Sequence, residues 1–91
     1  MNFEWDLKKA ATNLKKHGVS FDDAATVFAD SLSATQFDRE HSAREERFIT
    51  MGVDQSGKLL LIAHTDRGGY IRIISARKAT TAERKGYENQ S

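Results

Sequence analysis

Cysteine is absent from this 91-residue sequence, and its absence excludes disulfide bonds and thiolate metal sites. A reducing cytoplasm is therefore the simplest location to expect. No window approaches the ~20 apolar residues of a membrane-spanning helix, and the first residues lack the basic start and apolar run of a secretory signal. We therefore expect a single domain over residues 1–91 with no membrane partner.

Motifs for metals, nucleotides and acyl transfer are missing as well. The histidines at positions 17, 41 and 64 show no helical i, i+4 pairing, and the acids lack the spacing of a calcium loop. The sequence contains neither a glycine-rich phosphate loop nor a nucleophile elbow. We expect no metal and no cofactor.

The net charge of +1 conceals a strong segregation of charge along the chain. Residues 1–20 carry four lysines against two acids (+2), residues 21–54 carry three arginines against eight acids (−5), and residues 55–91 carry seven bases against three acids (+4). This asymmetry suggests a basic surface for nucleic acid and an acidic surface for a basic protein. Solvated charges that merely fall unevenly along the chain explain it equally well.

Hydrophobic periodicity predicts the first half of the fold. Residues 2–5 alternate as a short strand, and Asp6 is a suitable N-cap for a helix that ends at Gly18. Leu7, Ala10, Ala11 and Leu14 form one apolar stripe on this helix. A capping sequence at Ser20 begins a second short helix that ends near Asp30, so the two helices form a helical hairpin.

The second half of the chain has the period of strands. We expect a weak strand over 32–37, a charged loop over 38–46, a strand over 48–53, and a central strand over 59–63. A hairpin turn then leads into a strand from Tyr70, and a capping box at Thr80 opens a final helix that ends about Glu88. The order β-α-α-β-β-β-β-α predicts an α+β fold, an antiparallel sheet of four to five strands with helices mainly on one face.

The strand from Tyr70 is the most informative segment, because it alternates Ile with Tyr and Arg. A two-residue hairpin loop would place Ala63 and Thr65 on the side of Tyr70 and Arg72. His64 would lie on the opposite, apolar side, as a hydrogen-bonded core histidine rather than a catalytic one. The rigid donor fork of Arg72 suits phosphate oxygens, although a surface salt bridge is the simpler alternative.

Further basic residues lie at helix ends. Arg77 and Lys78 stand where the strand meets the last helix, so side chains and helix N–H groups could hold an anion together. Solvation explains Lys78 as well or better, and strict alternation places Arg77 on the opposite side from Arg72. Lys16 and His17 complement the dipole of the first helix, and their function requires that helix end to approach the open face of the sheet.

Several blocks, in order along nearly the whole chain, resemble the BrnT family of bacterial toxins. The most specific are Lys16-His17-Gly18-Val19 and Ile73-Ile74-Ser75-Ala76-Arg77-Lys78-Ala79-Thr80, accompanied by Phe3-Glu4-Trp5-Asp6, Asn13, Phe21, Ala24, Val27-Phe28-Ala29-Asp30, Glu45-Glu46-Arg47-Phe48, Gly52, Arg67, Gly69, Ile71-Arg72, Glu83-Arg84 and Tyr87-Glu88. The sequence departs from the family pattern at Ser31, where proline is common, and at Asp66, where glutamate is common.

The resemblance implies a RelE-like fold and the toxin of a type II toxin–antitoxin pair. Such toxins are ribonucleases that cut RNA and arrest translation. The partner implied is a BrnA-like antitoxin with a DNA-binding domain, and the complex of the two represses its own operon. Operator DNA would therefore be contacted only through the antitoxin.

A metal-independent endoribonuclease can use the 2′-hydroxyl of RNA as its nucleophile. It must remove the hydroxyl proton, stabilise charge on the phosphorane and protonate the leaving oxygen. Arg72 and Arg77 suit the second task, and the imidazole of His17 suits a proton transfer. Tyr87 or Glu83 is the candidate for the other proton transfer, although Glu83 is already explained as a capping residue. The residues expected to bind backbone phosphates are Lys16, Arg67 and Lys78.

Two other functions fit parts of the sequence. A non-catalytic nucleic-acid-binding module would use the same basic strand and leave RNA intact. A structural partner subunit would dock a basic protein through residues 38–54, and its arginines would only balance charge.

Overall fold

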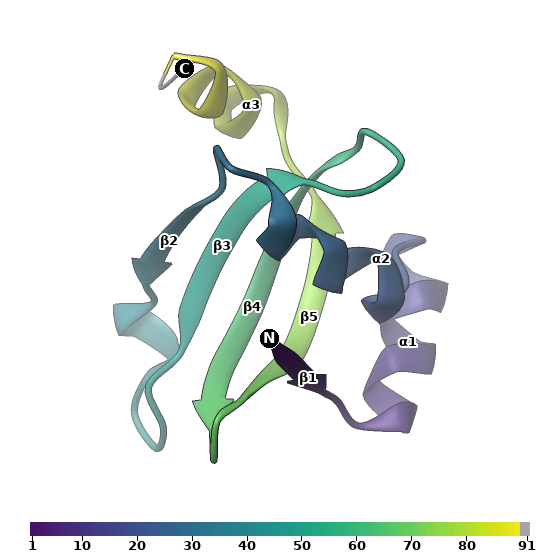
Figure 1. Ribbon diagram of the computed structural model, residues 1–91, viewed down its shortest axis with the longest axis vertical. Helices are drawn as coiled ribbons and strands as arrows, with labels where there is room; N and C mark the ends of the chain where they lie inside the picture. The colour runs from purple at the N-terminus through teal and green to yellow at the C-terminus, as the bar shows by residue number, and fades with distance from the viewer. Residues whose placement is uncertain (90–91) are drawn as a thin grey trace.

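The computed structural model describes residues 1–89 and shows a five-stranded sheet in the order β1-β5-β4-β3-β2 (Figure 1). The strands are β1 (Asn2–Glu4), β2 (Ala34–Phe37), β3 (Phe48–Val53), β4 (Leu59–Arg67) and β5 (Tyr70–Lys78); the helices are α1 (Leu7–His17), α2 (Phe21–Thr26) and α3 (Thr81–Glu88), with short 3-10 helices η1 (Val27–Ala29) and η2 (Arg39–His41). The predicted α+β fold and element order are confirmed, and β4 is the central strand.

The sheet is mixed, so the expectation of a purely antiparallel sheet is wrong at one edge. β1 pairs with the first residues of β5 in parallel, with Phe3 opposite Ile71 and Glu4 opposite Arg72. Parallel neighbours need a long crossover, which the intervening chain supplies. Alternation within a three-residue strand carries no information on its direction, and for this reason the sequence could not reveal the pairing.

Both caps of α1 and the N-cap of α2 are those expected, whereas α2 ends at Thr26 and the chain continues as η1 instead of as one helix to near Asp30. Asp6 Oδ1 accepts a hydrogen bond from the backbone N–H of Lys9 (3.0 Å), and Gly18 adopts a left-handed conformation (φ 70°) that ends α1. Ser20 Oγ accepts from the backbone N–H of Asp23 (3.1 Å) and starts α2. Local sequence therefore sets these boundaries.

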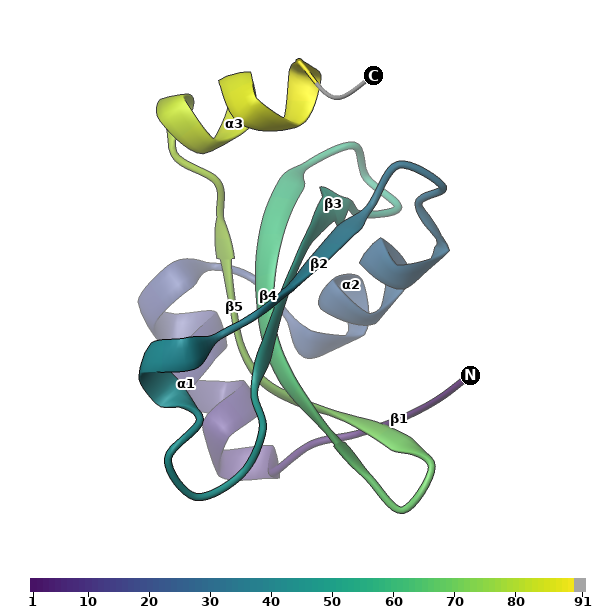
Figure 2. The same ribbon diagram turned by 90° about the vertical axis from the view of Figure 1, so that its left-hand side faces the viewer.

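The two N-terminal helices occupy different positions around β5 (Figures 1 and 2). α2 and η1 cover one face of the sheet, where their apolar side chains meet those of β4 and β5; the buried cluster is Val19, Phe21, Ala24, Val27, Leu60, Ile62, Ile73 and Ala76. We call this side the core face. α1 instead lies beside the edge of β5, in the part of that strand that β1 does not pair with.

Asn13 attaches α1 to this edge. Its side-chain amide donates to the backbone oxygen of Ala76 (2.8 Å), and its amide oxygen accepts from the Ala76 N–H (3.0 Å). The same amide also donates to the Val19 oxygen (3.0 Å). A single buried side chain therefore satisfies the strand edge as a neighbouring strand would.

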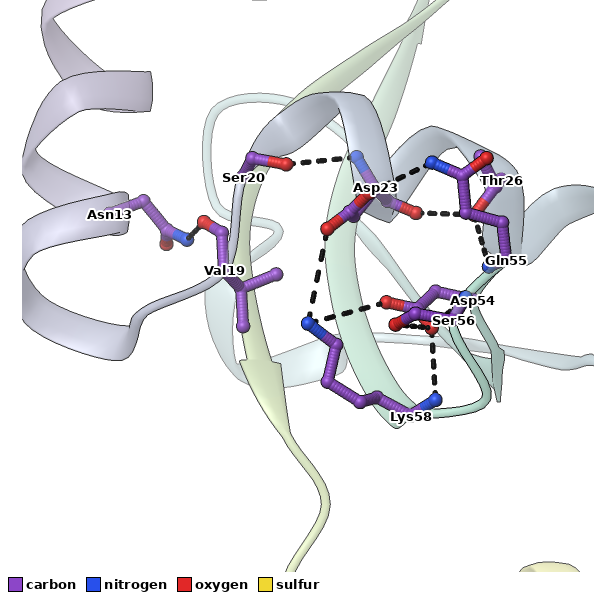
Figure 3. A network of polar contacts seen from close by, with 9 residues as sticks. All are labelled: Asn13, Val19, Ser20, Asp23, Thr26, Asp54, Gln55, Ser56 and Lys58. Atoms are coloured by element: carbon purple, nitrogen blue, oxygen red, sulfur yellow. Dashed lines mark hydrogen bonds and ion pairs between the residues drawn. The ribbon is translucent and has the colours of Figure 1, made fainter.

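A polar network joins α2 to the β3–β4 turn (Figure 3). Gln55 donates through its backbone N–H to Thr26 Oγ1 (2.9 Å) and through its side chain to Asp23 Oδ1 (3.0 Å). Lys58 Nζ lies 3.9 Å from Asp23 and 3.8 Å from Asp54. These contacts hold α2 over the core face.

α3 lies beyond the end of the strands in both ribbon views. Its predicted capping box is present: Thr80 Oγ1 accepts from the Glu83 N–H (3.2 Å), and Glu83 Oε1 accepts from the Thr80 N–H (2.8 Å). Among residues 1–89, no helix is both long and apolar enough to cross a membrane.

Candidate nucleic-acid interface

A β-bulge in β5 places Arg72 and Arg77 on the same face of the sheet. The hairpin loop is Gly68-Gly69, with Arg67 paired to Tyr70 and Thr65 to Arg72, so Thr65 and Arg72 share one side of the sheet as predicted. Farther along, His64 pairs with Ile73 but Ala63 pairs with Ser75, so Ile74 is the extra residue. The insertion reverses the alternation beyond it.

Strict alternation, which would separate the two arginines, therefore fails at Ile74. We call the side opposite the core face the arginine face; it carries Leu61, Ala63, Thr65, Arg72, Ser75 and Arg77. Arg77 is five positions after Arg72, which is roughly 15 Å along a strand. They are thus placed to bind different phosphates of one nucleic-acid strand.

Arg72 forms an ion pair with Glu4. Its Nη1 donates to Glu4 Oε2 at 2.6 Å, and the side chains are 25% and 31% exposed. The parallel pairing of β1 brings Glu4 opposite Arg72. The salt bridge considered as an alternative to anion binding is therefore present. The guanidinium has five N–H donors and the contact to Glu4 uses one on Nη1, so this contact does not by itself prevent anion binding.

Arg77 is held by two hydrogen bonds to one carboxylate. Nη1 and Nη2 donate to Oε1 and Oε2 of Glu83 at 2.9 and 3.0 Å. This contact, together with the capping bond from Thr80, lowers the pKa of Glu83 to about 2, and the carboxylate raises the pKa of Arg77. Arg77 nevertheless keeps 43% of its side chain exposed, so it is accessible to a ligand.

Lys16 and His17 do approach the sheet. They line a pocket of about 300 Å³ between α1 and β5, together with Ile74 and Ser75 of the bulge. The pKa of Asp6 is lowered chiefly by the hydrogen bond from the Lys9 N–H. The positive charge of nearby Arg72 makes a smaller contribution in the same direction. Asn13 is hydrogen-bonded to Ala76. α1 therefore runs beside β5 in the same direction, so Lys16 and His17 stand toward its Arg77 end.

The remaining candidate residues lie away from this pocket. Arg67, at the hairpin, has Nη2 3.9 Å from Glu45 Oε2 and a 57% exposed side chain. Lys78 is exposed and pairs with Leu60, which places it on the core-face side at the end of β5. Arg67 therefore borders the far end of the arginine face, and Lys78 does not share it.

The hydroxyl of Tyr87 is hydrogen-bonded to Asp30, which is not one of the predicted site residues. Its hydroxyl donates to Asp30 Oδ2 at 2.6 Å, and the same carboxylate oxygen accepts from the Val53 N–H (2.8 Å). The hydrogen bond to Asp30 raises the pKa of Tyr87 to about 12 and lowers that of Asp30. Tyr87 does not line the pocket that His17 and Ser75 share, so its catalytic role stays a prediction that this geometry does not favour.

His64 has the buried environment expected from the sequence, and His41 is exposed. His64 is 5% exposed, its Nε2 lies 2.7 Å from Thr50 Oγ1, and its ring stacks on Phe48 and meets Phe28 edge-on. Burial lowers the pKa of His64. His41 is 63% exposed beside Asp38. Neither histidine contributes to the arginine face.

Sequence reasoning missed several residues of the site. Lys8, Lys9 and Thr12 also line the pocket on α1. Their positions four and eight residues before Lys16 and His17 put them on one helix face, and this spacing could have revealed them. Glu4 could not have been found in this way, because its contact depends on the parallel β1 pairing. Among residues 1–89, no group of three or more His, Asp or Glu side chains could hold a metal ion.

Comparisons with known proteins agree on one family. A family model described as the ribonuclease toxin BrnT of type II toxin–antitoxin systems matches residues 5–83. The crystal structure of the Brucella abortus ribonuclease toxin BrnT is similar, with a TM-score of 0.66 and 21% identity, and the match covers 89% of this chain and 99% of that chain. At this identity the likeness shows a shared fold. No curated protein matches the chain.

Proposed function

Because this chain belongs to the BrnT family of ribonuclease toxins of type II toxin–antitoxin systems, we propose that it is an endoribonuclease that inhibits translation. Cleavage proceeds by attack of the RNA 2′-hydroxyl on the adjacent phosphate and requires no metal. The 5′-oxygen leaves with a proton, and the upstream product ends in a 2′,3′-cyclic phosphate. The observation that carries the proposal is the single face that holds Arg72 and Arg77 beside Lys16 and His17.

The arginines have separate tasks. Arg77 follows Ser75 by two residues on the same face, and Ser75 and His17 line the same pocket. We therefore assign Arg77 to the charge that develops on the reacting phosphate and His17 to a proton transfer there. Arg72, roughly 15 Å away along the strand, binds a neighbouring phosphate. Lys16 and Arg67 add phosphate contacts that weaken with salt, and Lys78 contributes from the end of β5.

A type II toxin has an antitoxin partner. We propose that this partner is BrnA-like, that it neutralises the toxin by blocking access to the arginine face, and that the complex binds operator DNA through the antitoxin. The cytoplasm, where translated RNA is found, is the location that this function requires.

The test uses purified protein and end-labelled RNA in buffer containing EDTA. We expect new products with 2′,3′-cyclic phosphate ends, and we expect no cleavage when the nucleotide before the cut carries a 2′-deoxyribose. Cleavage that needs added metal, or that persists at the 2′-deoxy position, would contradict the mechanism. RNA that is bound but left intact would favour the non-catalytic binding module.

A further inference from the structure

The pocket between α1 and β5 has a basic wall that extends beyond the residues assigned above. Lys8, Thr12 and Lys16 are spaced by four residues and form one row along α1, and Lys9 and His17 belong to the adjacent row. Lys8 and Lys16 lie about 12 Å apart along the helix axis. The pocket lining contains no carboxylate. The wall therefore presents positive charge along its full length.

Helix stability does not explain Lys8 and Lys9. They lie in the first turn of α1, which contains no acid, and there the helix dipole disfavours cations. Lys15, Lys16 and His17 differ, because they lie in the last turn, where cations are stabilising. An anionic ligand beside the first turn of α1 would explain the positions of Lys8 and Lys9.

The opposite wall of the pocket is formed by the bulge. Ile74, displaced from the regular alternation, is partly exposed and presents apolar surface, and Ser75 beside it presents a hydroxyl. Ser75 also belongs to the arginine face, so the pocket opens onto that face. The volume of about 300 Å³ is at the lower end of the range for small-ligand sites.

We propose that this pocket is a subsite for one nucleotide of single-stranded RNA. Lys8 and Lys9 bind a backbone phosphate at the Arg72 end of the pocket, Thr12 and Ser75 offer hydroxyls to the sugar or base, and the base packs against Ile74. Charge complementarity and continuity with the arginine face favour this ligand over a neutral one. The ligand class depends on the function proposed above.

The test measures binding of a fluorescent 2′-O-methyl RNA oligonucleotide, which cannot be cut. We compare Lys8→Gln/Lys9→Gln with the control Lys15→Gln/Lys85→Gln, which removes the same charge from exposed positions outside the pocket. We expect the pocket variant to bind roughly tenfold more weakly, with the slope of log K against log salt reduced by about 0.7, and the control to resemble wild type. Ile74→Ala should weaken binding without a change in slope.

Cleavage is measured in parallel, so that the two proposals can fail separately. If wild type binds the oligonucleotide selectively through Lys8 and Lys9 but cuts no RNA, the subsite stands and the proposed function fails. If the pocket and control variants lose the same affinity, or if wild type does not bind, the subsite is wrong whether or not RNA is cut.

Discussion

Arg77 and Glu83 form a two-point ion pair, and the same carboxylate caps α3. The arginine assigned to the reacting phosphate is thus oriented by the helix that follows its strand. A phosphate that binds Arg77 must share or displace this carboxylate. Under the proposed function, Glu83 would therefore both position Arg77 and compete with RNA for it.

Substitution of Glu83 separates these two effects. Glu83→Gln keeps a side chain able to complete the capping box but removes the charge. We expect tighter binding of uncleavable RNA and a loss of about 0.5–1 kcal/mol in the free energy of unfolding, since the pair is partly exposed. Glu40→Gln, an exposed acid in η2, is the matched control. Unchanged RNA affinity in Glu83→Gln would refute the competition.

The pKa of Glu83 adds a pH dependence. Because the folded pKa of about 2 lies below the ordinary 4.5, the stabilisation is complete above pH 4.5 and is lost as the pH falls toward 2. Chemical denaturation of wild type and Glu83→Gln should therefore give unfolding free energies that converge on acidification. A constant difference from pH 6 to pH 3 would contradict the role of this carboxylate.

Substitution of Tyr87 distinguishes a structural role of its hydroxyl from a catalytic one. Tyr87→Phe removes the hydrogen bond to Asp30 and should cost about 1 kcal/mol of unfolding free energy. If the hydroxyl serves only to attach α3 to Asp30, the cleavage rate of Tyr87→Phe near pH 7 should remain within about threefold of wild type. General acid–base groups contribute about 10²–10⁴-fold, so a loss of that size in a folded Tyr87→Phe protein would restore the catalytic role.

His64 should make stability depend on pH near neutrality. Burial lowers its pKa below the ordinary 6.5, so its contribution is complete above pH 6.5 and is lost as the pH falls through the lower folded value. We expect the unfolding free energy to fall between pH 7.5 and 5 in wild type and in His41→Gln. His64→Phe should show a smaller fall; an equal fall would show that another group titrates.

Asn13 should be critical for stability although it lies on a helix with exposed apolar residues. Asn13→Ala removes three hydrogen bonds and leaves buried backbone groups of Val19 and Ala76 without this partner. We expect a loss of about 2–4 kcal/mol. Lys15→Ala, on the exposed side of α1, should stay within about 0.5 kcal/mol of wild type. Equal effects of the two substitutions would contradict the account of how α1 is attached.

Rules for helix caps and turns predicted the features that depend on residues close together in the sequence. The caps at Asp6, Ser20 and Thr80 and the turn at Gly68-Gly69 depend on residues that are close together in the sequence. The starts of the helices and the presence of the hairpin could therefore be predicted. These rules also placed His64 in the core. The shared side of Thr65 and Arg72 was predicted correctly for the same reason.

Long-range packing explains the failures. The apolar stripe on α1 was expected from its spacing, but Leu7 is 79% and Leu14 is 52% exposed, because the buried side of the helix is organised by Asn13. The bulge at Ile74 depends on cross-strand packing that no local pattern encodes, and it decides which face Arg77 occupies. The sequence therefore named Arg72, Arg77, Lys16 and His17 as candidates, but it could not show how these residues are arranged.

The central claim is that the arginine face cuts RNA, and the most direct measurement is the cleavage rate of Arg72→Ala/Arg77→Ala. The matched control is Arg39→Ala/Arg84→Ala, which removes two exposed arginines elsewhere. We predict a loss of at least about 10²-fold in the folded double variant and little change in the control, since one donor to developing charge contributes about 10²–10³-fold. Wild-type cleavage by the Arg72→Ala/Arg77→Ala protein would contradict the account.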